Sequence, residues 1–515
     1  MEALATPTGS AERPGALVFV GFMGAGKTTA ARAAAAALGV PPLDSDREIE
    51  RALGESIESF FDRHGEAAFR AREEEVVLEL LGRDDARVIA LGGGALGSER
   101  VREALRAHTV VHLAIGAEEA WRRASGKGRP LARDRSRFEQ LKGDRENVYE
   151  ALATAWLPPM PRGGVRRAMP ALEALPATPA GTRLAWAAAA SGQYPVFFGR
   201  GLLASGFFHP PDGRRLVVTD ENVARQHPVG GDERIVIGPG EQQKTLVRAE
   251  EVLRRLADAG ATRGDVVVAV GGGVVGDLAG FCAAVYQRGV RWVGVPTTVV
   301  AQVDSAYGGK TGVDLPEAKN YVGAYHQPAA VLVDPSVLET LPPEEAAAGY
   351  AEVVKTALIG GGALWARVRE GGPVDDETIW RCLRTKLAIV AEDERDSGRR
   401  QVLNLGHTVG HAIEAATGYG RYRHGEAVGI GLLAALRLSD RDALRREVEG
   451  LLSERGLPTR FEGAAVEDVL AYAARDKKRA AGRVPFVLVG APGDVTAGHD
   501  VGADQLRTAV EELAA

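Results

Sequence analysis

The segment DVVVAVGGGVVGDLAGF, Asp265–Phe281, joins a short apolar run to a helical run through three consecutive glycines. The valine-rich part predicts a buried strand, and the glycines let the backbone turn tightly and approach a ligand closely. The amino end of the following helix suits a pyrophosphate. The spacing is not G-x-G-x-x-G, so a tight strand-to-helix turn without a ligand is the alternative interpretation.

Similar apolar runs lie on both sides of this segment, as RLVVTD, RIVIGPG, RWVGVPTT and AVLVDP. Their alternation with helical stretches predicts that residues 195–342 form a Rossmann-like α/β domain, with a mostly parallel sheet and ligands at the carboxyl ends of its strands. Polar residues follow these runs, namely Glu241, Lys244, Thr297, Thr298, Asp304, Lys310, Lys319 and Asn320. Among the cations, Arg288, Lys310 and Lys319 lie in Gly/Val-rich surroundings, a composition that grips phosphate and carboxylate.

Helical periodicity dominates residues 343–515, for which we predict an all-helical domain. Its segment NLGHTVGHAIEAATGYGRYRHGE, Asn404–Glu426, contains His407 and His411 four residues apart on one helix face, and His424 begins the next apolar run. Catalytic zinc sites take three protein ligands and leave one position open. Glu352 in GYAEVVKTALI is the candidate carboxylate ligand. The alternative is a histidine pair that only packs a helix.

The amino-terminal part contains LVFVGFMGAGKTTAARAAAAALG, which fits the P-loop pattern G-x-x-x-x-G-K-[ST] between a strand and a helix. Its backbone N–H groups cradle phosphates, Lys27 reaches the outer phosphates and the Thr28 hydroxyl holds Mg²⁺. The predicted ATP contacts are Gly24, Gly26, Lys27, Thr28 and Thr29. In the later DSD motif, one carboxylate of Asp44 and Asp46 is suited to Mg²⁺ and the other to substrate hydroxyls.

Further charged and glycine-rich motifs follow the P-loop. Arg70 lies in FRAREEE, where a solvated ion pair is the alternative interpretation, and GGG at residues 92–94 follows a strand. Arg129 in GKGRPLA belongs to a basic loop that is suited to close over the transferring phosphate. Arg145 and Tyr149 share a helix face. The prolines after Tyr149 predict an irregular end to this domain.

Length and composition set the remaining expectations. A chain of 515 residues predicts several domains, and we place a disordered start at 1–14, a P-loop domain with a parallel sheet at 15–160 and a linker at 161–194. The net charge of −6 argues against nucleic acid and membrane partners and favours small phosphorylated substrates. Two cysteines inside apolar segments, no signal peptide and no long apolar run predict a cytoplasmic protein.

In this order, GFMGAGKTT, DSD, FRAREEE, GGG, GRPLA and RENVY resemble shikimate kinase over about residues 15–150. The resemblance implies ATP-dependent phosphorylation of the shikimate 3-hydroxyl. It places Thr28 and Asp44 near Mg²⁺, Lys27 on the phosphates and Arg129 in the lid. The implied shikimate-binding residues are Asp46, Arg70, Gly93 and Arg145.

The motifs PGEQQKT, GGGVVGDLAGF, VPTTVVAQVDSAYGGKTG, KNYVGAYHQP, GYAEVVKTALI, NLGHTVGHAIE, HGEAV and DKK together resemble 3-dehydroquinate synthase over nearly all of residues 195–500. The resemblance implies NAD, a Zn²⁺ or Co²⁺ ion in a cleft between two domains, and the ligands Glu352, His407 and His424. The implied substrate-facing residues are Asp304, Lys310, Asn320, Lys355, Lys386, Arg400, Asn404, His411 and one of Lys477 or Lys478. The implied NAD contacts are Glu241 to Lys244, Gly272, Gly273, Val274, Val275, Gly276, Asp277, Thr297, Thr298, Lys310 and Lys319.

The reaction implied for this larger part converts 3-deoxy-D-arabino-heptulosonate 7-phosphate to 3-dehydroquinate with loss of phosphate and no net redox change. Family resemblance also implies a homodimer through the synthase part. Three alternatives remain: a metal-dependent polyol dehydrogenase, a sugar-phosphate cyclase that makes another carbocycle, and a P-loop module that regulates the synthase without catalysis.

Overall fold

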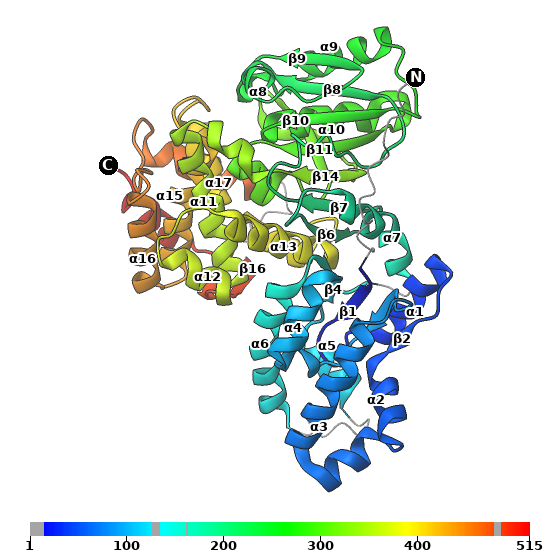
Figure 1. Cartoon of the computed structure of the whole chain (residues 1–515). Helices are drawn as coiled ribbons and strands as arrows, with labels where there is room; N and C mark the ends of the chain where they lie inside the picture. Colours follow the sequence, from blue (N-terminus) through cyan, green and yellow to red (C-terminus); the bar gives the residue numbers. More distant parts are fainter. Residues whose placement is uncertain (1–14, 126–133, 161–162, 478–485) are drawn as a thin grey trace, which may run out of the picture. The chain divides into compact units, whose positions relative to one another are not determined.

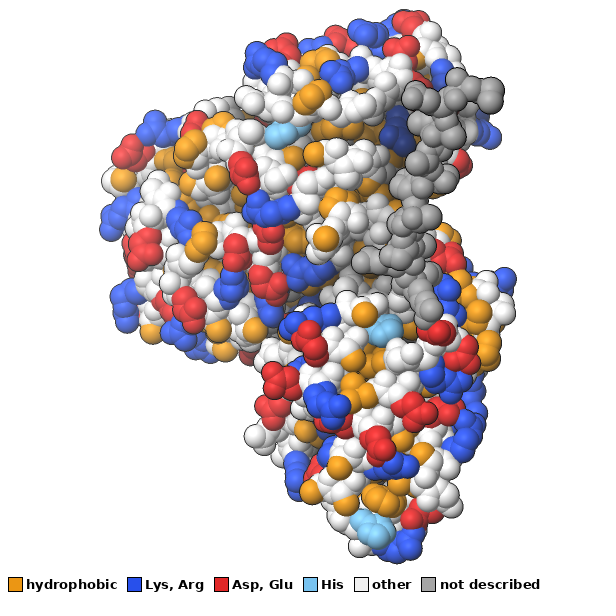
Figure 2. Space-filling view, viewed as in Figure 1, with side chains coloured by type: hydrophobic (Ala, Val, Ile, Leu, Met, Phe, Trp, Pro, Cys, Tyr) orange, Lys and Arg blue, Asp and Glu red, His pale blue; other side chains and the backbone are white. Residues whose placement is uncertain are grey.

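The computed structural model describes residues 15–125, 134–160, 163–477 and 486–515, and the chain divides into two compact units between Trp186 and Ala187. Figure 1 shows that each unit combines strands with covering helices. Within the described residues, every helix is too short or too polar to cross a membrane. Figure 2 shows both signs of charge interspersed over the visible face of each unit.

The first unit contains a parallel sheet in the order β2-β3-β1-β4-β5-β6. Its strands are β1 (Leu17–Val20), β2 (Leu43–Asp44), β3 (Val88–Ala90), β4 (Thr109–Leu113), β5 (Ala155–Leu157) and β6 (Arg183–Ala188). All four residues of β1 are buried, as the apolar run LVFV predicts for a strand flanked on both sides. The loop after β1 therefore begins at a fixed point in the middle of the sheet.

The helices of the first unit are α1 (Lys27–Leu38), α2 (Ser45–Leu53), α3 (Ile57–Leu81), α4 (Glu99–Ala104), α5 (Ala117–Ala124), α6 (Arg135–Leu152) and α7 (Gly164–Ala174). Gly39 ends α1 in the left-handed conformation, with φ 67°. Asp44 caps α2 by accepting a hydrogen bond from the backbone N–H of Asp46. The core combines Val18 and Val20 of β1 with Val77 of α3 and Phe138 of α6.

The chain after Tyr149 is more regular than its prolines predict. β5 is buried and pairs with β4, and α7 continues through Pro170. A proline inside a helix costs about 3 kcal/mol. Five apolar residues of α7 are buried, and their burial outweighs this cost. Residues 161–194, which the sequence predicts as a linker, contain α7, β6 and the first residues of β7 (Gln193–Phe198).

The second unit contains the predicted Rossmann-like parallel sheet, in the order β7-β14-β11-β10-β8-β9. Its other strands are β8 (Arg215–Asp220), β9 (Glu233–Ile237), β10 (Val266–Gly271), β11 (Arg291–Pro296) and β14 (Ala330–Val333). Around it lie α8 (Glu221–Gln226), α9 (Leu246–Asp258) and α10 (Gly273–Val285), with a hairpin of β12 (Lys310–Leu315) and β13 (Ala318–Tyr325). β10 is fully buried, and the segment Asp265–Phe281 forms β10, the glycine turn that follows it and the first part of α10.

The remaining helices of the second unit are α11 (Pro343–Gly360), α12 (Gly362–Arg369), α13 (Asp376–Glu392), α14 (His407–Ala416), α15 (His424–Leu438), α16 (Asp442–Ser453), α17 (Val466–Lys477) and α18 (Ala503–Glu511). A 3₁₀ segment, η9 (Arg399–Asn404), precedes α14. The prediction of an all-helical region misses the hairpin of β15 (Phe486–Ala491) and β16 (Asp494–His499). Short apolar runs such as FVLVG do not separate strand from helix by periodicity.

Candidate active sites

The P-loop of the first unit connects β1 to α1. Gly24 and Gly26 have φ values of 85° and 90°, which side chains with a Cβ rarely adopt. Lys27 Nζ donates to the carbonyl of Gly21 at 2.9 Å, and Thr28 Oγ1 donates to Asp44 Oδ2 at 2.8 Å. The structure therefore brings together the two residues that the sequence predicts to hold Mg²⁺.

Three charged side chains surround the glycines 92–94. A Cβ on Gly94 would lie 2.0 Å from the guanidinium of Arg70, and one on Gly92 would lie 2.7 Å from the carboxylate of Asp46. A Cβ on Gly93 would lie 3.6 Å from Arg145. The absence of side chains at 92–94 thus lets Asp46, Arg70 and Arg145 converge, as the predicted shikimate-binding set requires.

Two further residues of this site were not among those predicted. Glu73 is buried and accepts from Arg70 at 2.6 Å. Burial raises the pKa of Glu73, although Arg70 opposes the shift. Tyr149 Oη donates to the carbonyl of Gly93 at 3.0 Å, and burial raises the pKa of Tyr149 to about 12. The spacing of Glu73, three residues after Arg70 on one helix, was the available signal.

In the second unit, Glu352 of α11 lies opposite His407 of α14 and His424 of α15. Oε1 of Glu352 is 3.7 Å from Nε2 of His407 and 3.5 Å from Nε2 of His424. Ligands bound at 2.0–2.1 Å to one tetrahedral ion lie roughly 3.4 Å apart. Glu352 is fully buried, and its Oε1 accepts no hydrogen bond from any described residue. These three residues therefore fit one divalent ion.

His411 offers a second set of ligands. One nitrogen from each of His407, His411 and His424 lies within 4.8 Å of the others. His411 is exposed, whereas Glu352 is buried and carries a negative charge that a cation offsets. The set with Glu352 is the better match to a divalent cation, and His411 borders it.

Two lysines neutralise the carboxylates beside these histidines. Lys355 Nζ lies 2.5 Å from Glu352 Oε2 and 3.6 Å from Asp304 Oδ2, and Lys386 Nζ lies 2.5 Å from Asp304 Oδ1. Burial raises the pKa of Asp304, but the two lysines outweigh it and lower this pKa to about 2. The candidate metal ligand Glu352 thus belongs to a cluster without net charge, together with Asp304, Lys355 and Lys386.

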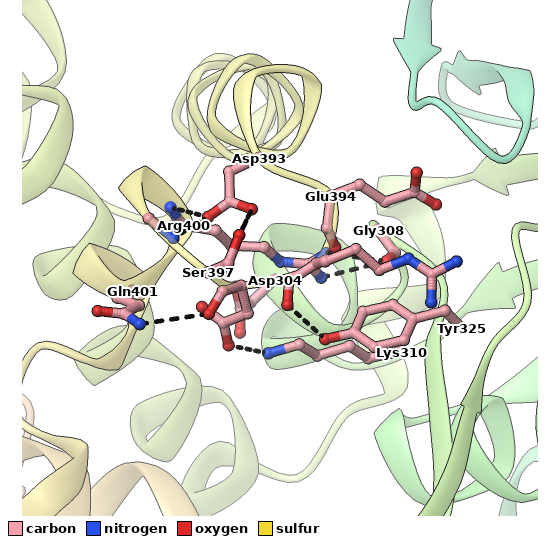
Figure 3. Close-up of polar contacts among 12 residues, drawn as sticks. Asp304, Gly308, Lys310, Tyr325, Asp393, Glu394, Ser397, Arg400 and Gln401 are labelled. Carbon is pink, nitrogen blue, oxygen red and sulfur yellow. Dashed lines mark hydrogen bonds and ion pairs between the residues drawn. The ribbon is translucent and has the colours of Figure 1, made fainter. Parts of the chain in front are cut away.

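Figure 3 shows the contacts of Arg400 and Lys310 beside Asp304. Arg400, which is 2% exposed, donates to the carbonyl of Glu394 at 2.5 Å and to that of Gly308 at 3.1 and 3.2 Å. Lys310 pairs with Asp396. Arg400 therefore fixes the loop that leads to Lys310, because it links the carbonyl of Gly308 in this loop to the carbonyl of Glu394.

The predicted nucleotide-binding residues gather at the carboxyl ends of β10 and β11. The N–H of Thr297 donates to the carbonyl of Gly271 at 3.0 Å, and a Cβ on Gly272 would lie 2.9 Å from Thr298. Residues 273–277 form the first turn of α10, where Asp277 pairs with the buried Lys244 at 2.7 Å. The partly exposed N-terminal turn of α10 beside Gly272 is suited to a pyrophosphate.

Not every predicted residue joins these groups. Arg288 precedes β11, so it lies at the amino ends of the strands, opposite to the edge that carries Thr297. Asn320 is exposed on β13, and Asn404 ends η9 just before α14. Arg129, Lys478 and the side chain of Lys477 lie outside the described residues. The sequence reasoning also missed Glu414, a buried carboxylate on the same helix as His407.

Comparisons with known proteins match both parts of the chain that carry these sites. Family models of the 3-dehydroquinate synthase N-terminal and C-terminal regions match residues 234–348 and 349–479. The 3-dehydroquinate synthase of Nitrobacter winogradskyi is 44% identical over 353 residues, which cover 61% of this chain and 91% of that protein. The chain belongs to the 3-dehydroquinate synthase family. A model of shikimate kinase matches residues 23–158, so the chain is a fusion of both enzymes.

Solved structures were also similar to parts of this fusion. A 2-deoxy-scyllo-inosose synthase complexed with carbaglucose-6-phosphate, NAD⁺ and Co²⁺ is 26% identical with a TM-score of 0.56, and the match covers 64% of this chain and 99% of that chain. A shikimate kinase from Acinetobacter baumannii in complex with shikimate is 36% identical, with a TM-score of 0.30 and coverage of 32% and 94%. The matches to the synthase and kinase family models together show a bifunctional enzyme of the shikimate pathway.

Proposed function

We propose that the second unit converts 3-deoxy-D-arabino-heptulosonate 7-phosphate to 3-dehydroquinate with release of phosphate, using NAD and Zn²⁺ or Co²⁺. The observation that carries this proposal is the convergence of Glu352, His407 and His424 beside buried lysines. The cyclase relative with bound NAD⁺ and Co²⁺ supports the choice of cofactors.

The residues of the second unit have distinct proposed roles. The bound cofactors supply reversible hydride transfer and polarisation of a substrate carbinol. Glu352, His407 and His424 hold the ion, and residues 272–277, Thr297, Thr298 and Lys319 hold the nucleotide. Lys355 and Lys386 bind the anionic groups of the substrate, and Asp304 forms ion pairs with both ammonium groups and holds them in place. Arg400 holds the loop of Gly308 so that Lys310 faces the same space.

Release of phosphate from the heptulosonate phosphate, without net NADH formation, tests this function. A polyol dehydrogenase would instead accumulate NADH with glycerol. Other sugar-phosphate cyclases form another carbocycle, but the identity of 44% to a 3-dehydroquinate synthase, against 26% to the inosose synthase, favours the former. Turnover of a phosphorylated sugar without a carboxylate, in preference to the heptulosonate phosphate, would overturn the proposal.

For the first unit we propose ATP-dependent phosphorylation of shikimate to shikimate 3-phosphate. Lys27 and the loop N–H groups bind the phosphates, and Thr28 with Asp44 holds Mg²⁺. Asp46 accepts the proton of the attacking hydroxyl, and Arg70 with Arg145 binds the shikimate carboxylate. Arg129, which lies outside the described residues, is the proposed contact of the transferring phosphate. Formation of ADP that depends on shikimate tests this role, and its absence in the purified chain would favour a regulatory P-loop module.

We further infer a cytoplasmic homodimer that assembles through the synthase unit. Both cysteines of the chain are free and buried, which supports a reducing compartment. β9 lies at the edge of its sheet, and Val236 and Val247 nearby are 44% and 69% exposed, which supports an apolar contact there. Light scattering tests the dimer, since the chain has a mass of 54.3 kDa.

A further inference from the structure

Glu414 lies on α14, seven residues after His407 and three after His411, so it shares the helix face of the histidines. Its side chain is 1% exposed. A buried carboxylate is costly unless cations or N–H donors surround it. The groups that contact Glu414 therefore indicate the role of its carboxylate.

A histidine and a lysine from different parts of the second unit meet at Glu414. Oε2 lies 3.3 Å from Nδ1 of His424, and Oε1 accepts from Nζ of Lys319 at 2.8 Å. His424 begins α15, whereas Lys319 belongs to the β12–β13 hairpin beside the nucleotide-binding sheet. Lys319 also lies 3.8 Å from Glu241. One carboxylate thus joins a proposed metal ligand to a proposed nucleotide contact.

The geometry at His424 is suited to a metal ligand that binds through Nε2 while a carboxylate fixes Nδ1 on the other side of the ring. A proton on Nδ1 donates to Glu414 and leaves the lone pair of Nε2 facing Oε1 of Glu352, 3.5 Å away. A carboxylate partner of this kind orients the imidazole and increases its basicity.

We propose that Glu414 is a positioning residue that couples retention of the metal to binding of the nucleotide. The inference rests on the proposed function, because it takes His424 as a metal ligand and Lys319 as an NAD contact. Without nucleotide, the ammonium of Lys319 offsets part of the negative charge that Glu414 directs at His424. Phosphates at Lys319 draw this ammonium away, and Glu414 then polarises His424 more strongly.

The coupling has a definite sign and is reciprocal. NAD increases metal affinity, and the metal increases NAD affinity by the same factor. The same electrostatics predict opposite effects on metal affinity for changes at Glu414 and at its partner Lys319. Glu414→Gln weakens metal binding because the charge behind His424 is lost. Lys319→Gln strengthens metal binding in the absence of NAD because the offsetting cation is lost.

The test is a chelator competition on the full chain, titrated with Co²⁺ with and without NAD, with visible absorption of bound Co²⁺ as the readout. For the wild type we expect NAD to tighten metal binding about 5-fold or more. Glu414→Gln weakens metal binding by about 10-fold or more and abolishes the effect of NAD. Lys319→Gln tightens metal binding without NAD, which general disruption of the site would not do.

Glu394→Gln is the matched control. Glu394 is also buried in the second unit, but it accepts from Ser191 and Gln327, away from the histidines. This variant keeps the metal affinity of the wild type. Unchanged metal affinity in Glu414→Gln, or an undiminished NAD effect, overturns the inference. If the wild type binds no Co²⁺ at all, the proposed metal site itself is wrong, a different result from either of these.

Discussion

The two candidate sites place their charges in different environments. In the kinase unit the phosphate cradle is mainly backbone, Asp46 is exposed and Arg70 pairs with the exposed Glu66. In the synthase unit Glu352 and Lys355 are 0% and 1% exposed. Apart from the buried contact of Arg70 with Glu73, water stabilises the charges of the first site, whereas those of the second rely on one another. In the kinase unit, removal of a charge therefore lowers activity without lowering stability. In the synthase unit, removal of a charge lowers stability as well.

The largest effect is expected for Lys27→Ala. Loss of the ammonium at the outer phosphates lowers shikimate phosphorylation by about 10³-fold or more, because this charge acts where negative charge develops. The thermal midpoint stays that of the wild type, since Lys27 is partly exposed and lies at the first position of α1. Coupled measurement of ADP formation and a thermal unfolding scan check both statements.

Phosphate release from the heptulosonate phosphate serves as the internal control for Lys27→Ala. It remains at the wild-type rate, because the altered residue belongs to the other unit. A lower midpoint, or a parallel loss of synthase activity, would contradict the proposed separation of activity from stability in the kinase unit.

Glu352→Gln is the corresponding change in the synthase unit. Without the carboxylate, the buried Lys355 keeps only Asp304 at 3.6 Å, and the metal loses one ligand. Breaking a buried pair from one side costs about 3 kcal/mol. We expect the metal-free variant to unfold at a lower temperature than the metal-free wild type and to retain less metal after dialysis, measured by elemental analysis.

The double variant Glu352→Gln/Lys355→Met separates the two losses. It removes both members of the pair, so most of the stability returns while metal retention does not. If Glu352→Gln alone keeps the wild-type midpoint, then the charges of this unit do not rely on one another and the contrast with the kinase unit fails.

The predictability of the two sites from sequence differs for a physical reason. The P-loop is one contiguous motif, and the alternation of apolar runs in residues 195–342 was enough to predict the parallel sheet of the synthase unit. The candidate metal ligands come from α11, α14 and α15. Spacing located His407 and His411 together, whereas Glu352 was chosen as an acidic residue in an apolar helix, and only the fold shows that it lies beside them.

Individual side-chain contacts were harder to predict from the sequence than motifs. Nothing local in the sequence distinguishes Arg400, which binds carbonyls, from an arginine that binds substrate. Arg288 was misplaced because a Gly-rich neighbourhood occurs at both edges of a sheet, and only the topology shows that this residue precedes β11. Glu414 was on the predicted helix face, but its partner Lys319 lies 95 residues away.

A smaller effect is expected for Tyr149→Phe, which tests the buried part of the kinase site. The phenol bridges the Gly93 carbonyl and the neighbouring Arg145, and its loss removes a buried hydrogen bond worth about 1 kcal/mol. We expect the KM for shikimate to rise roughly 5- to 10-fold, with the KM for ATP unchanged, in steady-state assays.

Tyr286→Phe is the matched control for this change, because Tyr286 also donates to a backbone carbonyl, that of Ala261, but in the other unit. It leaves both kinase constants unaltered. An equal rise in the KM values for shikimate and ATP in Tyr149→Phe would show general loosening of the fold instead of misplacement of Gly93 and Arg145.

The smallest effect is expected for Asp265→Asn, which removes a buried carboxylate of the synthase unit far along the chain from the metal ligands. Asp265 accepts from Arg214 at 2.9 and 3.2 Å and from the N–H of Thr262 at 2.7 Å. Despite burial, the hydrogen bond from Arg214 lowers the pKa of Asp265 to about 2.

A carboxyl group whose pKa is lowered in the folded protein stabilises the fold at pH values above its ordinary pKa near 4, and this contribution is lost as the pH falls through about 2. Because Arg214 is partly exposed, we expect Asp265→Asn to destabilise by about 1 kcal/mol at pH 7. The difference from the wild type in urea-unfolding midpoint should stay constant from pH 7 to 5 and shrink between pH 4 and 3. A difference that persists unchanged at pH 3 would mean that packing, and not charge, explains the stability of this pair, and that reliance of charges on one another is confined to the metal site.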